Sequence, residues 1–168
     1  VDVRVLRETF GLLADKGFRG LRIDEVARRS GVPKSTIYRR WPSLVDLAVD
    51  AVDTAMGSRE CEPGEDPLAD LSAIIVRAHA FFTTSPLSGS LPQIALGLIG
   101  HPEAQAAYRD RIIAPLRNGA IDAVTRAAAA GRWQGPDPTT SVDMMIGAIV
   151  YRFNYLGHAA DLDEAFEV

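Results

Sequence analysis

The chain has 168 residues, of which 47% are hydrophobic and 24% are charged, close to the average of globular domains. This length fits one domain of ordinary size or a small module joined to a medium one, and the composition excludes disordered and collagen-like chains. The apolar run at residues 144–151 is too short to cross a bilayer, which takes about 20 residues. We expect no secretory leader, because charged residues interrupt the first apolar positions.

The residue types needed for common catalytic and metal sites are scarce. The only cysteine, Cys61, forms neither an internal disulfide nor a zinc site by itself, which fits a reducing cytoplasm. His79, His101 and His158 lie far apart, and none has metal-ligand spacing to another ligand. We also find no glycine-rich phosphate loop and no nucleophile elbow. The sequence therefore predicts no catalytic residue, no metal and no cofactor, and a protein that is not an enzyme.

The net charge of −4 conceals a strong asymmetry along the chain. Residues 1–45 carry ten Lys or Arg and five acidic residues, a net charge of +5, whereas residues 46–168 have a net charge of −9. A basic segment on an acidic protein indicates a polyanionic partner for that segment. On charge alone, however, a surface helix with solvated charges is the better explanation.

Helical periodicity and helix-end residues recur through the first third of the chain. A first helix through Val5, Leu6, Phe10 and Leu13 should end at Gly17, whose left-handed backbone is typical of such ends. Further helices are predicted at residues 24–30, closed by Gly31, at residues 34–41, and at about 43–56 with Ser43 as N-cap. Residues 57–66 are polar, contain Gly and Pro, and read as a linker.

The remainder of the chain is also predicted to be helical. The expected elements are a helix from Asp66-Pro67 to about Thr84, a loop at 85–90, a short helix after Pro92, a long segment from His101-Pro102 to Gly131, a helix from Asp137-Pro138 to about Gly157, and a last one from near Asp161. The inward side of the first of these should carry Leu68, Leu71, Ile75, Ala78 and Phe82. Pro115 should kink or split the long segment, because proline lacks an N–H and crowds the preceding turn. No strand-like alternation occurs. We therefore predict an all-α fold of eight or nine helices.

Residues 24–41 have the pattern of a helix-turn-helix. Ala27 leaves room where two helices cross, and Gly31 accepts the positive φ of the turn. Val32 and Ile37 then fill the wedge between the helices. The outward side of the second helix carries residues suited to phosphates and base edges: Lys34, Ser35, Thr36, Tyr38, Arg39 and Arg40. The alternative is a three-helix module whose polar side is merely solvated.

Residues 3–52 closely resemble the DNA-binding domain of the TetR (TetR/AcrR) family of transcriptional regulators. The matching stretches are FGLLADKGF at 10–18, IDEVARRSG at 23–31 and VPKSTIYRRWPSLVDL at 32–47. The resemblance implies a helix-turn-helix domain at 1–45 and a ligand-binding and dimerising helical domain at 46–168, linked by the helix at about 43–56. Arg22 stands where the family usually has a capping Ser or Thr, and can replace its phosphate contact but not the cap. Leu44 stands where a lysine is usual.

The C-terminal region is rich in bulky apolar side chains with a few polar ones, and a pocket of this kind between bundle helices is the normal site for a small, mainly apolar ligand. Candidate pocket residues are His79, Phe82, Leu96, Tyr108, Ile112, Met144 and Tyr151. For each of them, ordinary core packing is the simpler interpretation. The last two helices resemble in position the dimer interface of the family. In the helix at 138–157, Met145, Ile149, Arg152, Phe153 and Leu156 form one stripe and Ala148, Tyr151 and Tyr155 another, and the sequence leaves open which of them meets the partner.

Three functions are therefore compared. The first is a homodimeric regulator, most often a repressor in this family, that a small and mainly apolar ligand releases from a near-palindromic operator in double-stranded DNA. The second has the same fold but only dimerises or binds another protein through its C-terminal region. The third is an all-α enzyme or carrier with a basic N-terminal helix trio. Binding to duplex DNA separates the third from the others. We predict the first, in the cytoplasm and without a membrane partner.

Overall fold

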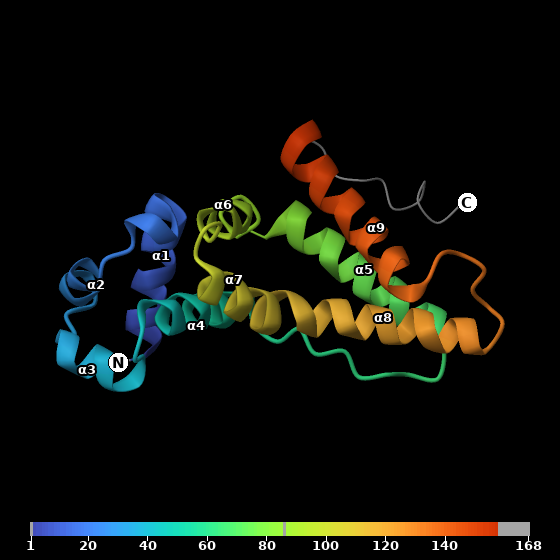
Figure 1. Ribbon diagram of the computed structural model, residues 1–168, viewed down its shortest axis with the longest axis horizontal. Coiled ribbons are helices and arrows are strands. Elements are labelled where there is room, and N and C mark those ends of the chain that lie inside the picture. The colour runs from blue at the N-terminus through green and yellow to red at the C-terminus, as the bar shows by residue number, and fades with distance from the viewer. Residues whose placement is uncertain (1, 86, 158–168) are drawn as a thin grey trace. The chain divides into compact units, whose positions relative to one another are not determined.

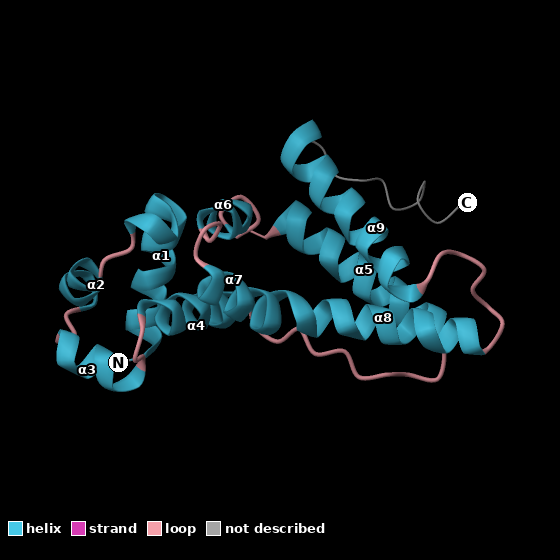
Figure 2. Ribbon diagram, viewed as in Figure 1, coloured by secondary structure: helices cyan, strands magenta, loops and turns pink. Residues whose placement is uncertain are grey.

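The computed structural model describes residues 2–85 and 87–157, and in this part of the chain it contains nine α-helices, two π-helical turns and no strand (Figures 1 and 2). The all-α fold class is thus confirmed. No helix in these residues is long and apolar enough to span a membrane. The helix expected from Asp161 lies outside the described residues.

The chain groups into two compact units, each described here by itself. Unit 1 comprises residues 1–58 and 89–113, and unit 2 comprises residues 59–88 and 114–168. The described helices of unit 1 are α1 (Asp2–Gly20), α2 (Ile23–Ser30), α3 (Lys34–Arg40), α4 (Leu44–Met56), α6 (Leu91–Gly97), α7 (Pro102–Tyr108) and the π turn η1 (Arg109–Ile113). Those of unit 2 are α5 (Pro67–Thr84), α8 (Ala114–Ala129), α9 (Pro138–Tyr151) and the π turn η2 (Arg152–Leu156).

Helix α1 forms the centre of unit 1, where it packs against α2, α4 and α6. Its buried side carries Val5, Leu12 and Leu13, which meet an equally buried side of α4 that includes Leu47 and Val52. Gly17 interrupts α1 at the position predicted for its end, with φ 65° and ψ 177°, and helical backbone continues to Gly20. The core of this unit therefore fixes α4 against α1, and α2 and α3 extend from it.

Local hydrogen bonds determine where α4 begins. The Ser43 hydroxyl accepts from the backbone N–H of Asp46 at 3.1 Å, and the Ser43 N–H donates to the Asp46 carboxylate at 3.2 Å. In this reciprocal capping box, the backbone N–H groups of Ser43 and Asp46 each donate to the side chain of the other residue. The N-cap predicted at Ser43 is confirmed.

Helix α6 and the start of α7 contact the end of α1. The backbone of Gly97 lies so close to Phe18 that an added Cβ would sit 3.3 Å from the Phe18 nitrogen. The ring of Phe18 meets His101 edge-on, with centroids 5.1 Å apart, and Arg19 donates to the carbonyl of Ile99 at 3.3 Å. His101 is the residue before α7, as the sequence indicates.

A π-helical turn divides the long helical segment predicted between His101 and Gly131. Helix α7 ends at Tyr108, η1 covers Arg109–Ile113, and α8 begins at Ala114. Pro115 has no N–H to donate to the carbonyl of Arg111 four residues earlier, so regular α-helical bonding fails there. The predicted interruption is confirmed, and it takes the form of a π turn.

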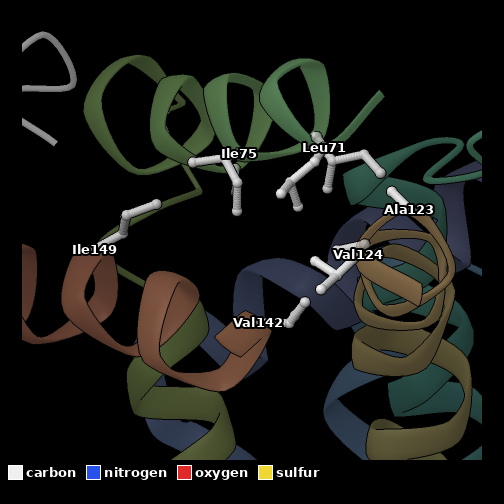
Figure 3. Close-up of a cluster of buried hydrophobic side chains, with 9 residues drawn as sticks. Leu71, Ile75, Ala123, Val124, Val142 and Ile149 are labelled. Atoms are coloured by element: carbon white, nitrogen blue, oxygen red, sulfur yellow. The ribbon is translucent and has the colours of Figure 1, made fainter. Parts of the chain in front are cut away.

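Unit 2 is built around the packing of α5, α8 and α9 (Figure 3). Its buried cluster is Leu71, Ile74, Ile75, Ala78, Ala120, Ala123, Val124, Val142 and Ile149. The predicted inward side of α5 is confirmed at Leu71, Ile75 and Ala78, which are buried, and at Phe82, which is partly buried against this cluster. Ile74 is also buried although it was not expected to be, and Leu68 is only half-buried.

The stretch predicted as a linker has no helix, but it is held against unit 2 from residue 59 onward, where Arg77 donates to the carbonyls of Arg59 and Glu60 and Cys61 packs against the core. Arg126 donates to the carbonyl of Gly64 at 3.1 Å and to Asp70 at 2.7 Å, and Arg132 binds Asp66 at 2.8 Å. The hydrogen bonds from Arg126 and from the Gly64 N–H lower the pKa of Asp70, so it is charged at neutral pH. Two carboxylate–arginine pairs and one bond from an arginine to a carbonyl thus hold the end of this segment and the start of α5 in place.

Candidate nucleic-acid interface

Helices α2 and α3 form the helix-turn-helix predicted from residues 24–41. Gly31 follows α2 in the left-handed conformation, with φ 65° and ψ 21°. Val32 and Ile37 are buried between the helices, as expected for residues that fill the wedge, and Ala27 is half-buried. The turn has a further bond, from the Val32 N–H to the Ser30 hydroxyl at 3.3 Å.

Charged residues hold α2 against the end of α1. Lys16 donates to both carboxylate oxygens of Glu25, at 2.9 and 2.7 Å, and Arg28 and Arg29 lie within 3.7 Å of the same carboxylate. The hydrogen bond from Lys16 lowers the pKa of Glu25, so this carboxylate is ionised at neutral pH. The contact orients the helix-turn-helix on α1.

The outward side of α3 presents most of the residues predicted to contact DNA. Lys34, Ser35, Tyr38, Arg39 and Arg40 are exposed, and Thr36 is half-buried. Five of the six side chains are therefore accessible on one short helix. Their contact with DNA remains a prediction.

Two of these cations are paired with acidic residues in the free chain. Lys34 contacts Asp24 of α2, and Arg40 contacts Asp2 of α1. Arg39 has no acidic partner among the residues that the structure describes. DNA phosphates would therefore compete with Asp24 and Asp2, whereas Arg39 needs no exchange of partners.

Arg22 stands directly before α2 and supplies no side-chain cap. Its guanidinium instead donates to the carbonyls of Arg19 at 2.8 Å and Leu21 at 2.9 Å. These bonds hold it beside the end of α1. The phosphate contact expected of Arg22 stays a prediction.

The predicted pocket residues are divided between the two units. Leu96, Tyr108 and Ile112 belong to unit 1, whereas His79, Phe82, Met144 and Tyr151 belong to unit 2. Ile112 is buried, and Leu96, Met144 and Tyr151 are exposed. Phe82 packs against Phe153, with ring centroids 5.7 Å apart. No ligand contact of these residues is established.

The two sides of α9 have different surroundings. Ile149 is buried and Met145 is partly buried against the core of unit 2. On the other side, Met144 is 62% exposed and Tyr151 55%, and Ala148 is also exposed; Tyr155 of the following turn η2 is 74% exposed. We call Met144, Ala148, Tyr151 and Tyr155 the exposed stripe. Of the stripe that contains Ile149, Met145 and Ile149 face the core of unit 2, whereas Leu156 at its end is 50% exposed.

Sequence reasoning missed a polar network inside unit 1. The indole N–H of Trp41 donates to Asp50 at 2.7 Å, and Arg111 contacts the other oxygen of Asp50 at 2.5 Å and Asp53 at 3.4 Å. The available signal was a carboxylate between the buried α4 residues Val49 and Ala51. Its partners were not predictable, because they lie nine and 61 residues away in the chain.

Two family models together cover nearly the whole chain. "Bacterial regulatory proteins, tetR family" matches residues 5–51, and "Tetracyclin repressor-like, C-terminal domain" matches residues 63–168. The chain belongs to the TetR family and is a DNA-binding transcriptional regulator. The resemblance noted in the sequence is confirmed.

Individual relatives agree with this assignment. The uncharacterized HTH-type transcriptional regulator YdeS of Bacillus subtilis (strain 168) is 27% identical over 157 residues, covering 91% of this chain and 78% of YdeS. The crystal structure of the TetR family transcription regulator SCO0332 superposes with a TM-score of 0.66 at 28% identity, over 95% of this chain and 88% of that one. AibR, solved in complex with isovaleryl coenzyme A and operator DNA, has a TM-score of 0.64 at 17% identity, over 92% and 86% of the two chains. The last of these supports the fold only.

Replacing Lys34 by alanine is expected to weaken binding to all duplex sequences by a similar factor. A lysine at the start of α3 contributes through phosphate charge, so the slope of log affinity against log salt should fall by about one per subunit. Titration of labelled duplexes at several salt concentrations measures it. Asp24→Asn, which removes the intramolecular partner of Lys34, should act in the opposite direction. A loss confined to one base position would contradict a phosphate role.

Proposed function

We propose that this protein is a homodimeric repressor that binds a near-palindromic operator through α3 and releases it when a small, mainly apolar ligand binds. The observation that carries the proposal is that α3, the second helix of a fully formed helix-turn-helix, exposes Lys34, Tyr38, Arg39 and Arg40. Residues 1–45 would bind DNA, and residues 46–168 would dimerise and bind the ligand. Such a regulator acts on DNA in the cytoplasm and is not an enzyme.

The exposed stripe supports the dimer. An apolar row of this kind is typical of a surface that a partner covers. Two reading helices held at a fixed separation match a palindrome, whose half-sites lie about 34–36 Å apart or a multiple of that distance. Single copies would bind one half-site each and gain no selectivity from spacing.

Selection of bound fragments from a random duplex pool tests the DNA-binding part of the proposal. We expect an inverted repeat, protected as two half-sites, and a particle of two chains on size measurement. Enrichment of an asymmetric half-site by a monomer would contradict the dimeric mode. Recovery of fragments without common sequence would contradict an operator.

Release by a ligand is tested on the selected duplex. The compounds are apolar acids, alcohols and aromatic molecules, together with acyl coenzyme A thioesters, because AibR was solved with isovaleryl coenzyme A. A coupling of about 1–3 kcal/mol between the two sites corresponds to a 5–150-fold change in operator affinity. A compound that raises the unfolding temperature and lowers DNA affinity supports the proposal. Unchanged affinity across the panel would favour a C-terminal region that only dimerises or binds another protein.

A further inference from the structure

One carboxylate within unit 1 connects the residue that follows α3, the helix proposed to read the DNA sequence, to the π turn η1. Asp50 of α4 accepts from the Trp41 indole through Oδ2 at 2.7 Å and from Arg111 of η1 through Oδ1 at 2.5 Å. Both oxygens of the carboxylate are therefore occupied, one by Trp41 and the other by Arg111. A charged acceptor makes these bonds stronger than bonds between neutral groups.

Trp41 is the residue through which this network reaches α3. Its backbone N–H donates to the carbonyl of Ile37 at 2.9 Å and closes the last turn of the helix. The residue is only 6% exposed, so the indole cannot move without disturbing the packing around it. Since Arg39 and Arg40 directly precede it, the position of the indole determines where the end of the reading helix lies.

Arg111 is the residue through which the network reaches η1. It stands four residues before Pro115, where the missing N–H and the bulk of the proline ring disturb regular helical bonding. Single π turns inside helices are often found at functional sites. A change between π and α geometry at residues 109–113 would shift the Arg111 guanidinium relative to α4.

We propose that Asp50 is a positioning residue that couples η1 to α3, so that the geometry of the π turn sets the affinity for DNA. Neither Asp50 nor Arg111 belongs to the residues predicted to contact DNA. The coupling rests on the proposed operator binding, and it supplies a physical path by which a change at η1 alters that binding.

Asp50→Asn separates the two halves of the network with little change in size. The amide has one acceptor oxygen, so it serves either Trp41 or Arg111, and its NH₂ group repels whichever donor remains. Arg111→Met removes the other end while keeping an apolar stem. Asp53→Asn is the matched control, because Asp53 lies on the same helix and contacts the same arginine but not Trp41.

The first measurement is affinity for a duplex selected by the unsubstituted protein. Removal of an acid from a DNA-binding protein raises affinity if only long-range charge matters, so both Asn variants should then bind more tightly. The coupling predicts that Asp50→Asn instead binds about tenfold more weakly, while Asp53→Asn does not. Arg111→Met should be weakened to a similar degree, and the double variant no further than either single one. Equal behaviour of the two Asn variants, or independent losses in the double variant, would overturn the proposal.

The second measurement needs no DNA. The chain has two tryptophans, and Trp133→Phe leaves only Trp41, so the tryptophan fluorescence emission of this variant reports on the Trp41 indole alone. Arg111→Met should shift this emission although Arg111 does not bond to Trp41, and Asp53→Asn should leave it unchanged. Thermal unfolding confirms that all variants are folded at the temperature used.

The two measurements distinguish failure of the coupling from failure of the proposed function. If Arg111→Met leaves the emission unchanged, the coupling is wrong even where the protein selects an operator. If the emission responds but the protein enriches no duplex, operator binding is wrong, and with it the effect on DNA affinity, while the link between η1 and Trp41 stands.

Discussion

Replacing Tyr151 by glutamate is expected to convert the proposed dimer into monomers and to weaken the proposed operator binding by at least about a hundredfold. The side chain lies in the middle of the exposed stripe and is stacked on Tyr155, with ring centroids 5.5 Å apart. A carboxylate there would be buried without a partner when two copies meet. Loss of the dimer removes the effective concentration that joins the two half-sites, which is worth about 10²–10⁴ in affinity.

Size measurement and duplex titration check this result together. Tyr151→Phe keeps the ring and should remain dimeric, and Thr139→Glu adds the same charge at the exposed start of α9, away from the stripe. Retention of a dimer in Tyr151→Glu would show that another surface joins the copies. A monomer that keeps full operator affinity would show that dimerisation is not needed for DNA binding.

Arg39→Ala is expected to reduce affinity for the selected operator by about 1–3 kcal/mol for each half-site and to relax its sequence preference. Arginine binds guanine O6 and N7 through two parallel hydrogen bonds, which alanine cannot replace. Arg39 is exposed on α3 and has no acidic partner among the described residues, so its guanidinium is available without breaking an ion pair.

Parallel titration with the operator and with random duplex measures the change in preference. Arg7→Ala is the matched control, because Arg7 is an exposed arginine of α1 that is paired with Glu8. The control should lower affinity for both duplexes slightly and equally. If Arg39→Ala and Arg40→Ala each bound both duplexes as the unsubstituted protein does, α3 would not be the reading helix.

The parts of the fold that were predicted correctly depend on short-range bonding. Helix α4 begins after Ser43, α5 after Asp66 and α9 after Asp137, and in each case the side chain of that residue accepts from a backbone N–H two or three residues later. Such bonds involve neighbours in the chain, so the sequence contains them directly. The turn at Gly31 is predictable for the same reason.

The parts that were not predicted depend on contacts between distant residues. The choice of Ile74 over Leu68 for the core follows from how α5 lies between α8 and α9, and the exposed stripe of α9 follows from the same packing. In the candidate site, the α3 residues were predicted from the sequence and five of the six are exposed, but the pairing of Asp24 and Asp2 with Lys34 and Arg40 was not predicted. Nor did it indicate that Asp50 joins Trp41 to Arg111.

The segment between α4 and α5 illustrates how composition and mechanical role differ. By composition it reads as a spacer, yet its Gly64 and Asp66 are bonded to Arg126 and Arg132 of α8 and the turn that follows it. Inserted residues would have to break these bonds to a different helix, whereas the bonds of the exposed loop at residues 134–137 stay within the loop and the first turn of α9. Tags, fluorescent domains or new chain termini should therefore be tolerated better after α8 than before α5.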